Sequence, residues 1–115
     1  MLEVHMKTIH NIDIIEIKGD VDLYSSPKVR KIIIKLIQKK RPVLLVNLGE
    51  VTYMDSSGVA TLVEGLQMIN EYGGKLCIFN IHGAVRDVFE LSHLDKVFNI
   101  YENETLAIES CHDQN

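Results

Sequence analysis

The chain has 115 residues, of which 46% are apolar and 24% charged, and this suits one globular domain with a core of its own. Its net charge of −4 argues against a nucleic-acid-binding protein, which needs a basic face. Two isolated cysteines, no secretory signal and no apolar run of membrane-spanning length predict a cytoplasmic protein that does not insert into a membrane.

The N-terminal residues predict a β-hairpin. Apolar and polar residues alternate over residues 2–6 and again over 12–17, on either side of His10-Asn11. Gly19 is expected to break the second strand, because glycine weakens strand interiors.

A first helix is expected to start at Ser26, as its N-cap, with Pro27 as its first helical residue. Apolar residues then recur at helical spacing and predict one buried stripe: Val29, Ile32, Ile33, Leu36 and Ile37. Basic residues cluster in the same region and are interpreted as the solvated face of the helix and its C-terminal turn: Lys28, Arg30, Lys31, Lys35, Lys39, Lys40 and Arg41.

Two short apolar runs, Val43–Leu48 and Lys75–Phe79, predict strands that are covered on both faces. Cys77 lies inside the second run and is expected to be a small buried hydrophobic residue. A helix with one apolar stripe joins the two runs and ends at Gly73-Gly74.

The C-terminal part predicts a helix from Ala84 to Leu91, a short strand at Val97–Ile100 and a closing helix over Glu104–Ser110 that Asn103 caps. The order β-β-α-β-α-β-α-β-α predicts an α/β fold with a mixed, mostly parallel sheet, about four helices and an antiparallel N-terminal hairpin. Six residues are expected in its core: Leu44, Val46, Leu62, Leu66, Ile78 and Phe89.

The polar residues Asp55-Ser56-Ser57-Gly58 lie between an apolar approach and an amphipathic run. They follow an inner strand, and sites in open α/β sheets form beyond the carboxyl ends of strands. One capping side chain is enough to start a helix, and both serines can cap. Two interpretations therefore stay open, a plain helix start and a functional site.

Common catalytic motifs are missing around this segment. There is no G-x-S-x-G elbow, no P-loop, no metal-ligand spacing and no histidine placed as a base. Asp20 and Asp22 imitate the acidic pair of response-regulator receivers, but no lysine follows the last expected strand. The sequence predicts neither an enzyme nor a bound metal or cofactor. A serine that another enzyme phosphorylates fits better, since a phosphate suits a helix N-terminus and repels a docked partner.

Three segments carry a resemblance to a known family: VTYMDSSG at Val51–Gly58, GDVDLYSSPKVR at Gly19–Arg30 and GAVRDVFELSHLDKVFNIY at Gly83–Tyr101. They resemble the bacterial anti-sigma factor antagonists, which are single-domain members of the STAS family. With the order of elements, the resemblance covers nearly the whole chain. It implies one STAS domain over residues 1–111, and residues 112–115 are expected to fray.

The resemblance implies a partner switch without catalysis by this chain. The unmodified antagonist binds an anti-sigma factor that is also a serine kinase, and so frees the sigma factor. The kinase uses Mg-ATP to phosphorylate the antagonist, and a PP2C-type phosphatase resets it. By position Ser56 carries the phosphate, and the antagonist is expected to be a monomer. The partner-binding residues implied are Asp22, Tyr24, Asp55, Ser57, Gly58 and Val59.

One departure from the family pattern leaves an alternative open. Many antagonists continue with Gly-Leu-Gly after the serines, whereas Gly58-Val59-Ala60-Thr61 stands here. This segment is also similar to the corresponding sequence of STAS subunits of lipid-transport ABC systems, which dock on the transporter's ATPase.

Overall fold

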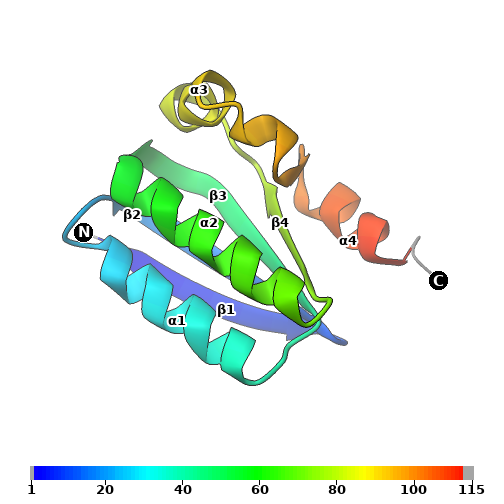
Figure 1. Cartoon of the computed structure of the whole chain (residues 1–115). Helices are drawn as coiled ribbons and strands as arrows, with labels where there is room; N and C mark the ends of the chain where they lie inside the picture. Colours follow the sequence, from blue (N-terminus) through cyan, green and yellow to red (C-terminus); the bar gives the residue numbers. More distant parts are fainter. Residues whose placement is uncertain (1, 113–115) are drawn as a thin grey trace.

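The computed structural model describes residues 2–112, and within them the expected order of strands and helices is confirmed (Figure 1). The elements are β1 (Glu3–Ile9), β2 (Ile12–Val21), α1 (Ser26–Gln38), β3 (Val43–Met54), α2 (Ser56–Glu71), β4 (Lys75–Phe79), α3 (Gly83–Leu91), a 3₁₀ turn η1 (Leu94–Lys96), β5 (Asn99–Tyr101) and α4 (Glu104–His112).

The strands form one sheet in the order β1-β2-β3-β4-β5. β1 pairs antiparallel with β2, and Ile9 lies opposite Ile12 across the tight turn; the other pairs are parallel. The helices α1 and α2 run side by side over one face of the sheet (Figure 1). The mixed, mostly parallel sheet with an antiparallel N-terminal hairpin is therefore confirmed.

Alternate residues of the central strands feed two hydrophobic clusters. Leu44 and Val46 belong to the larger cluster, which also holds residues of α1, α2 and α3. Leu45 points the other way, into a smaller cluster that α4 covers through Ala107. Cys77 lies in that smaller cluster with no exposed surface, and burial raises the pKa of its thiol to about 11. Its expected role as a buried hydrophobic residue is confirmed.

The core prediction is confirmed for Leu44, Val46, Leu62, Ile78 and Phe89, all of which are buried. It is wrong for Leu66, which is only half-buried. The buried line of α2 runs through Leu62, Gly65 and Ile69, so Leu66 lies one position to the side of it.

The strand ends differ from the predictions. β2 does not end at Gly19: it passes through this residue, which has a φ of +110°, and continues to Val21. Register shifts against β3 on either side of Lys18 show that the chain bulges here instead of ending the strand. β3 likewise continues past Leu48 to Met54.

The helix ends also differ in detail. Ser25, not Ser26, is the N-cap of α1, and Ser26 is a buried first-turn residue. Asn103 caps α4 as expected, because its Oδ1 accepts the amide of Leu106 at 2.9 Å. His112 is the last residue of α4 and so belongs to a helix, whereas 113–115 lie outside the described residues.

The last strand begins two residues later than expected. The 3₁₀ turn η1 precedes it and has Val97 as its C-cap, so Val97 is not part of a strand. β5 instead runs from Asn99 to Tyr101 and pairs with β4.

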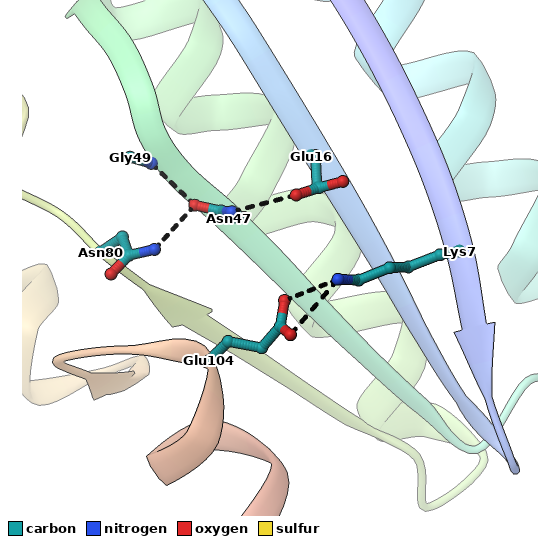
Figure 2. Close-up of polar contacts among 6 residues, drawn as sticks. All are labelled: Lys7, Glu16, Asn47, Gly49, Asn80 and Glu104. Carbon is teal, nitrogen blue, oxygen red and sulfur yellow. Dashed lines mark hydrogen bonds and ion pairs between the residues drawn. The ribbon is translucent and has the colours of Figure 1, made fainter.

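Polar contacts tie the sheet to the start of α4 (Figure 2). Lys7 on the edge strand β1 reaches Glu104, with 3.1 Å between Nζ and a carboxylate oxygen. Asn47 on the central strand accepts hydrogen bonds from the amide of Gly49, at 2.9 Å, and from Asn80, at 3.2 Å. Its own amide group donates to Glu16 at 3.4 Å, so one side chain connects β2, β3 and the segment after β4.

Candidate functional site

Asp55 starts α2 and joins two segments of the chain. One carboxylate oxygen accepts the amides of Ser57, at 2.9 Å, and Gly58, at 3.2 Å, which is the usual geometry of an N-cap. The other oxygen accepts the amide of Leu23 at 3.1 Å, while the Asp55 amide donates to the carbonyl of Val21. Asp55 is therefore the cap, and it fixes the loop after β2 against the helix start.

The two serines after Asp55 have different environments. The hydroxyl of Ser57 donates to the Asp55 carboxylate at 2.6 Å, and its side chain is half-buried. Ser56 is the first helical residue, is exposed, and its hydroxyl makes no hydrogen bond within residues 2–112. Ser56 is thus the hydroxyl that is free to react with another molecule.

The loop after β2 is held rigidly by its own polar residues. Asp22 accepts the amides of Tyr24, at 2.9 Å, and Ser25, at 3.0 Å. The Ser25 hydroxyl in turn accepts the amide of Asp22 at 2.9 Å. Because its carboxylate is engaged inside the loop, Asp22 shapes this segment and sets the position of Tyr24.

Gly58 is buried at the start of α2. A Cβ added there would lie 2.7 Å from Cγ of Met54 and 2.8 Å from Cγ1 of Val21. Glycine lets the start of α2 lie this close to β2 and β3. Val59 follows it and is half-buried against the larger cluster.

Three exposed apolar side chains lie in the two segments that meet at Asp55, the loop after β2 and the end of β3. Tyr24 is 90% exposed, Leu23 65% and Tyr53 50%. Large apolar side chains gathered on a surface often mark a place where another protein binds. We call Leu23, Tyr24, Tyr53 and Ser56 together the Ser56 surface. Leu23 and Tyr53 were missing from the sequence prediction, although a leucine in the polar segment GDVDLYSS was a usable signal.

An open cleft of about 630 Å³ lies elsewhere on the sheet. Polar residues from separate parts of the chain line it, among them His5, Glu16, Asn47, Asn80 and His82. Figure 2 shows three of these lining residues, Glu16, Asn47 and Asn80, joined by hydrogen bonds. No local motif connects these residues, so the cleft was not predictable from the sequence.

The sequence model of the STAS domain family matches residues 3–107. The chain belongs to the STAS domain family. Among its relatives, the anti-sigma F factor antagonist of Paenibacillus polymyxa is 27% identical over 108 residues, which are 93% of this chain and 92% of that protein. The expected membership is confirmed.

Solved structures carry the same STAS fold. An anti-sigma factor antagonist from Mycobacterium paratuberculosis superposes with a TM-score of 0.89 at 19% identity, covering 96% of this chain and 93% of that one. The phosphorylated form of the Bacillus cell fate determinant SpoIIAA gives a TM-score of 0.75 at 21% identity, covering 95% of this chain and 99% of that one.

Two further observations describe this STAS domain. Within residues 2–112 no group of three or more His, Cys, Asp or Glu side chains is arranged to hold a metal ion. In the same residues no helix is both long enough and apolar enough to cross a membrane.

The pKa of Asp55 in this STAS domain lies below its ordinary value of 3.8, chiefly because the Ser57 hydroxyl donates to the carboxylate. The amides of Gly58, Ser57 and Leu23 lower it further, while partial desolvation opposes them. We expect Ser57→Ala to move the Asp55 pKa back toward 3.8 and Ser56→Ala to leave it in place. NMR titration of the Asp55 carboxyl carbon measures both variants.

The lowered pKa of Asp55 makes the stability of the folded chain depend on pH in the acidic range. A carboxyl whose pKa is lowered by folding stabilises the folded state above its unfolded pKa, and loses this effect as the pH falls through the folded pKa. Wild type should therefore lose the Asp55 contribution progressively as the pH falls from near 3.8 through the lowered folded pKa, and Ser57→Ala should have less to lose. An equal pKa change in both variants would contradict the assignment to the Ser57 hydroxyl.

Proposed function

We propose that this chain is an anti-sigma factor antagonist of the partner-switching kind. Its unphosphorylated form binds an anti-sigma factor that is also a serine kinase, and this binding frees the sigma factor. The kinase transfers phosphate from Mg-ATP to Ser56, the antagonist is released, and a PP2C-type phosphatase restores it. The chain acts as a monomer and as a substrate, not as a catalyst.

The observation that carries this proposal is the contrast between the two serines. A kinase needs a hydroxyl that is accessible and can enter its active site. Ser56 is exposed and its hydroxyl is free in the described residues, whereas the Ser57 hydroxyl is bound to Asp55. The local chemistry thus favours Ser56 as the acceptor, which is the residue that the resemblance to the family implies.

Asp55 determines which backbone amides at the start of α2 are left to bind a phosphate on Ser56. The sequence suggested that the free amides of a helix start would stabilise the phosphate. In the folded chain Asp55 already occupies the amides of Ser57 and Gly58. A phosphate therefore lies beside a carboxylate with few amides left for it, and its added charge acts outward on a bound partner.

The relatives support the same role. The anti-sigma F factor antagonist of Paenibacillus polymyxa aligns over nearly its full length. The Bacillus determinant SpoIIAA, which shares the fold, has a phosphorylated form. The exposed apolar side chains of Leu23, Tyr24 and Tyr53 are of the kind on which a protein partner docks.

The test is to incubate the protein with its cognate kinase and Mg-ATP and to map the modified residue by fragmentation mass spectrometry. We expect phosphate on Ser56 in wild type and in Ser57→Ala, and none in Ser56→Ala. Ser56→Ala should still bind the kinase, which separates a lost acceptor from lost docking. Phosphate on Ser57 alone would refute the site. A verified partner that never phosphorylates the chain would favour a constitutive transporter subunit instead.

A further inference from the structure

The charges of this chain are segregated along the sequence. Seven of the twelve Lys and Arg residues fall within residues 28–41, and no Asp or Glu occurs from 23 to 49. The other five basic and all sixteen acidic residues lie elsewhere, so the rest of the chain carries a net charge of −11. A protein with a negative net charge therefore has one strongly positive region, on and after α1.

Most cations in this region make no ion pair. Arg30 forms a two-pronged pair with Glu64 of α2, Arg41 pairs with Asp13, and Lys40 lies over the ring of Tyr72. The remaining four are exposed and have no partner within residues 2–112: Lys28, Lys31, Lys35 and Lys39. They are available to a molecule from outside.

The charge pattern of α1 differs from that of an ordinary solvent-exposed helix face. A solvated helix usually mixes both signs, which gives stabilising pairs three and four positions apart. In α1 Lys31 and Lys35 are four positions apart and repel each other, as do Lys28 and Lys31 at three. Lys28 also lies in the first turn, where the helix dipole disfavours a cation and no acidic residue compensates. The like charges and Lys28 cost the helix some stability, which the favourable place of Lys35 in the last turn offsets in part.

A shallow groove runs along the same face. It has a volume of about 460 Å³, and its lining is Pro27, Arg30, Lys31, Ile34, Lys35 and Gln38. Ile34 is half-buried between the two lysines, whose methylene stems extend the apolar surface while their ammonium groups reach the solvent. Such a surface suits an apolar side chain of a partner with carboxylates on both sides of it.

We propose that this α1 face docks an acidic surface of the same kinase partner that binds at Ser56, so the inference rests on the proposed function. Pro27, at the start of the groove, follows Tyr24 after two residues, and α1 runs beside α2, whose first residue is Ser56 (Figure 1). The seven cations accelerate encounter with the acidic partner, and Ile34 adds a contact in the complex. The partner's docking surface therefore carries carboxylates that face Lys31 and Lys35.

The test measures association and dissociation rates with the kinase by stopped-flow fluorescence, at low and high salt. Charge complementarity acts mainly on association and weakens with salt, so Lys31→Glu with Lys35→Glu should slow association about tenfold or more at low salt. The same pair changed to Gln should give an intermediate rate. Ile34→Ser should speed dissociation several-fold and leave association unchanged, because the contact forms only in the complex.

Lys18→Glu with Lys96→Glu is the matched control, since it changes the net charge equally on exposed residues outside α1. We expect it to alter association far less than the α1 pair. Equal rates for the two pairs would overturn the acidic partner surface, and unchanged dissociation in Ile34→Ser would overturn the contact. Wild type that binds phosphatidylglycerol vesicles through Lys31 and Lys35 would reassign the face to a membrane, and sedimentation showing self-association through it would reassign the face to a second copy. Wild type that fails to bind the kinase at all would instead refute the proposed function.

Discussion

Phosphorylation of Ser56 is expected to weaken binding of the kinase partner about a hundredfold. The phosphate adds about −1.5 to −2 charges to an exposed hydroxyl next to the Asp55 carboxylate. Like charges forced together across an interface cost several kcal/mol, and about 3 kcal/mol corresponds to this factor. If the exposed side chains of Leu23, Tyr24 and Tyr53 dock on the same partner, they would also lose their dry contact with it.

Titration calorimetry of the unmodified and the phosphorylated protein against the kinase measures this change. Treatment with phosphatase should restore the original affinity. Ser56→Asp should weaken binding less than phosphate does, because one carboxylate has a smaller charge and a different shape. Ser92→Asp, an exposed serine at the end of α3, controls for added charge alone. Affinities within about twofold of each other for the two forms would refute a charge switch at Ser56.

Leu62→Ala should lower the free energy of unfolding by about 2–5 kcal/mol, and Leu66→Ala should lower it clearly less. Leu62 is 1% exposed in the larger cluster, so its removal leaves a cavity. Leu66 is half-buried, and solvent can fill part of the space. A loss of this size at Leu62 is a large share of the roughly 5–15 kcal/mol that stabilises a domain.

Urea denaturation followed by far-UV circular dichroism measures both variants, since the chain has no tryptophan. The two leucines occupy neighbouring turns of α2, so the gain in helix propensity on changing leucine to alanine cancels in the comparison. An equal loss in both variants would mean that Leu66 is as deeply buried as Leu62.

The sequence predicted the order of elements because the spacing of apolar residues within a helix or strand shows which of its faces lies against the core. It failed at boundaries where tertiary pairing overrides a local signal. Gly19 looks like a strand breaker, yet a bulge carries β2 through it to Val21. β3 extends past Leu48 through the mixed residues 49–54 because β2 continues beside it: Glu50 pairs with Lys18, and Tyr53 with Asp20.

The sequence predicted which segment forms the candidate site, but not how its side chains are arranged and bonded. Three cap-type residues in a row cannot be ranked by composition, since Asp55, Ser56 and Ser57 all suit an N-cap. In the structure Asp55 is the cap, because one of its oxygens accepts the amides of Ser57 and Gly58. The amide of Leu23, 32 positions away, holds its second oxygen. Tyr24 is exposed and Asp22 is bonded within its own loop, while Gly58 has a packing role that the close approach of Val21 and Met54 explains.

The Asn47 contacts bear on how the strands choose their alignment. A strand that slips by one residue turns every side chain to the opposite face of the sheet. Such a slip in β3 would place the amide of Asn47 in the larger apolar cluster, where an unpaired polar group costs about 1–3 kcal/mol. In the native alignment the same amide meets Glu16, Gly49 and Asn80. Asn47 thus helps to fix the register of β3. It raises the free energy of a slipped sheet that the apolar residues of β3 alone would tolerate.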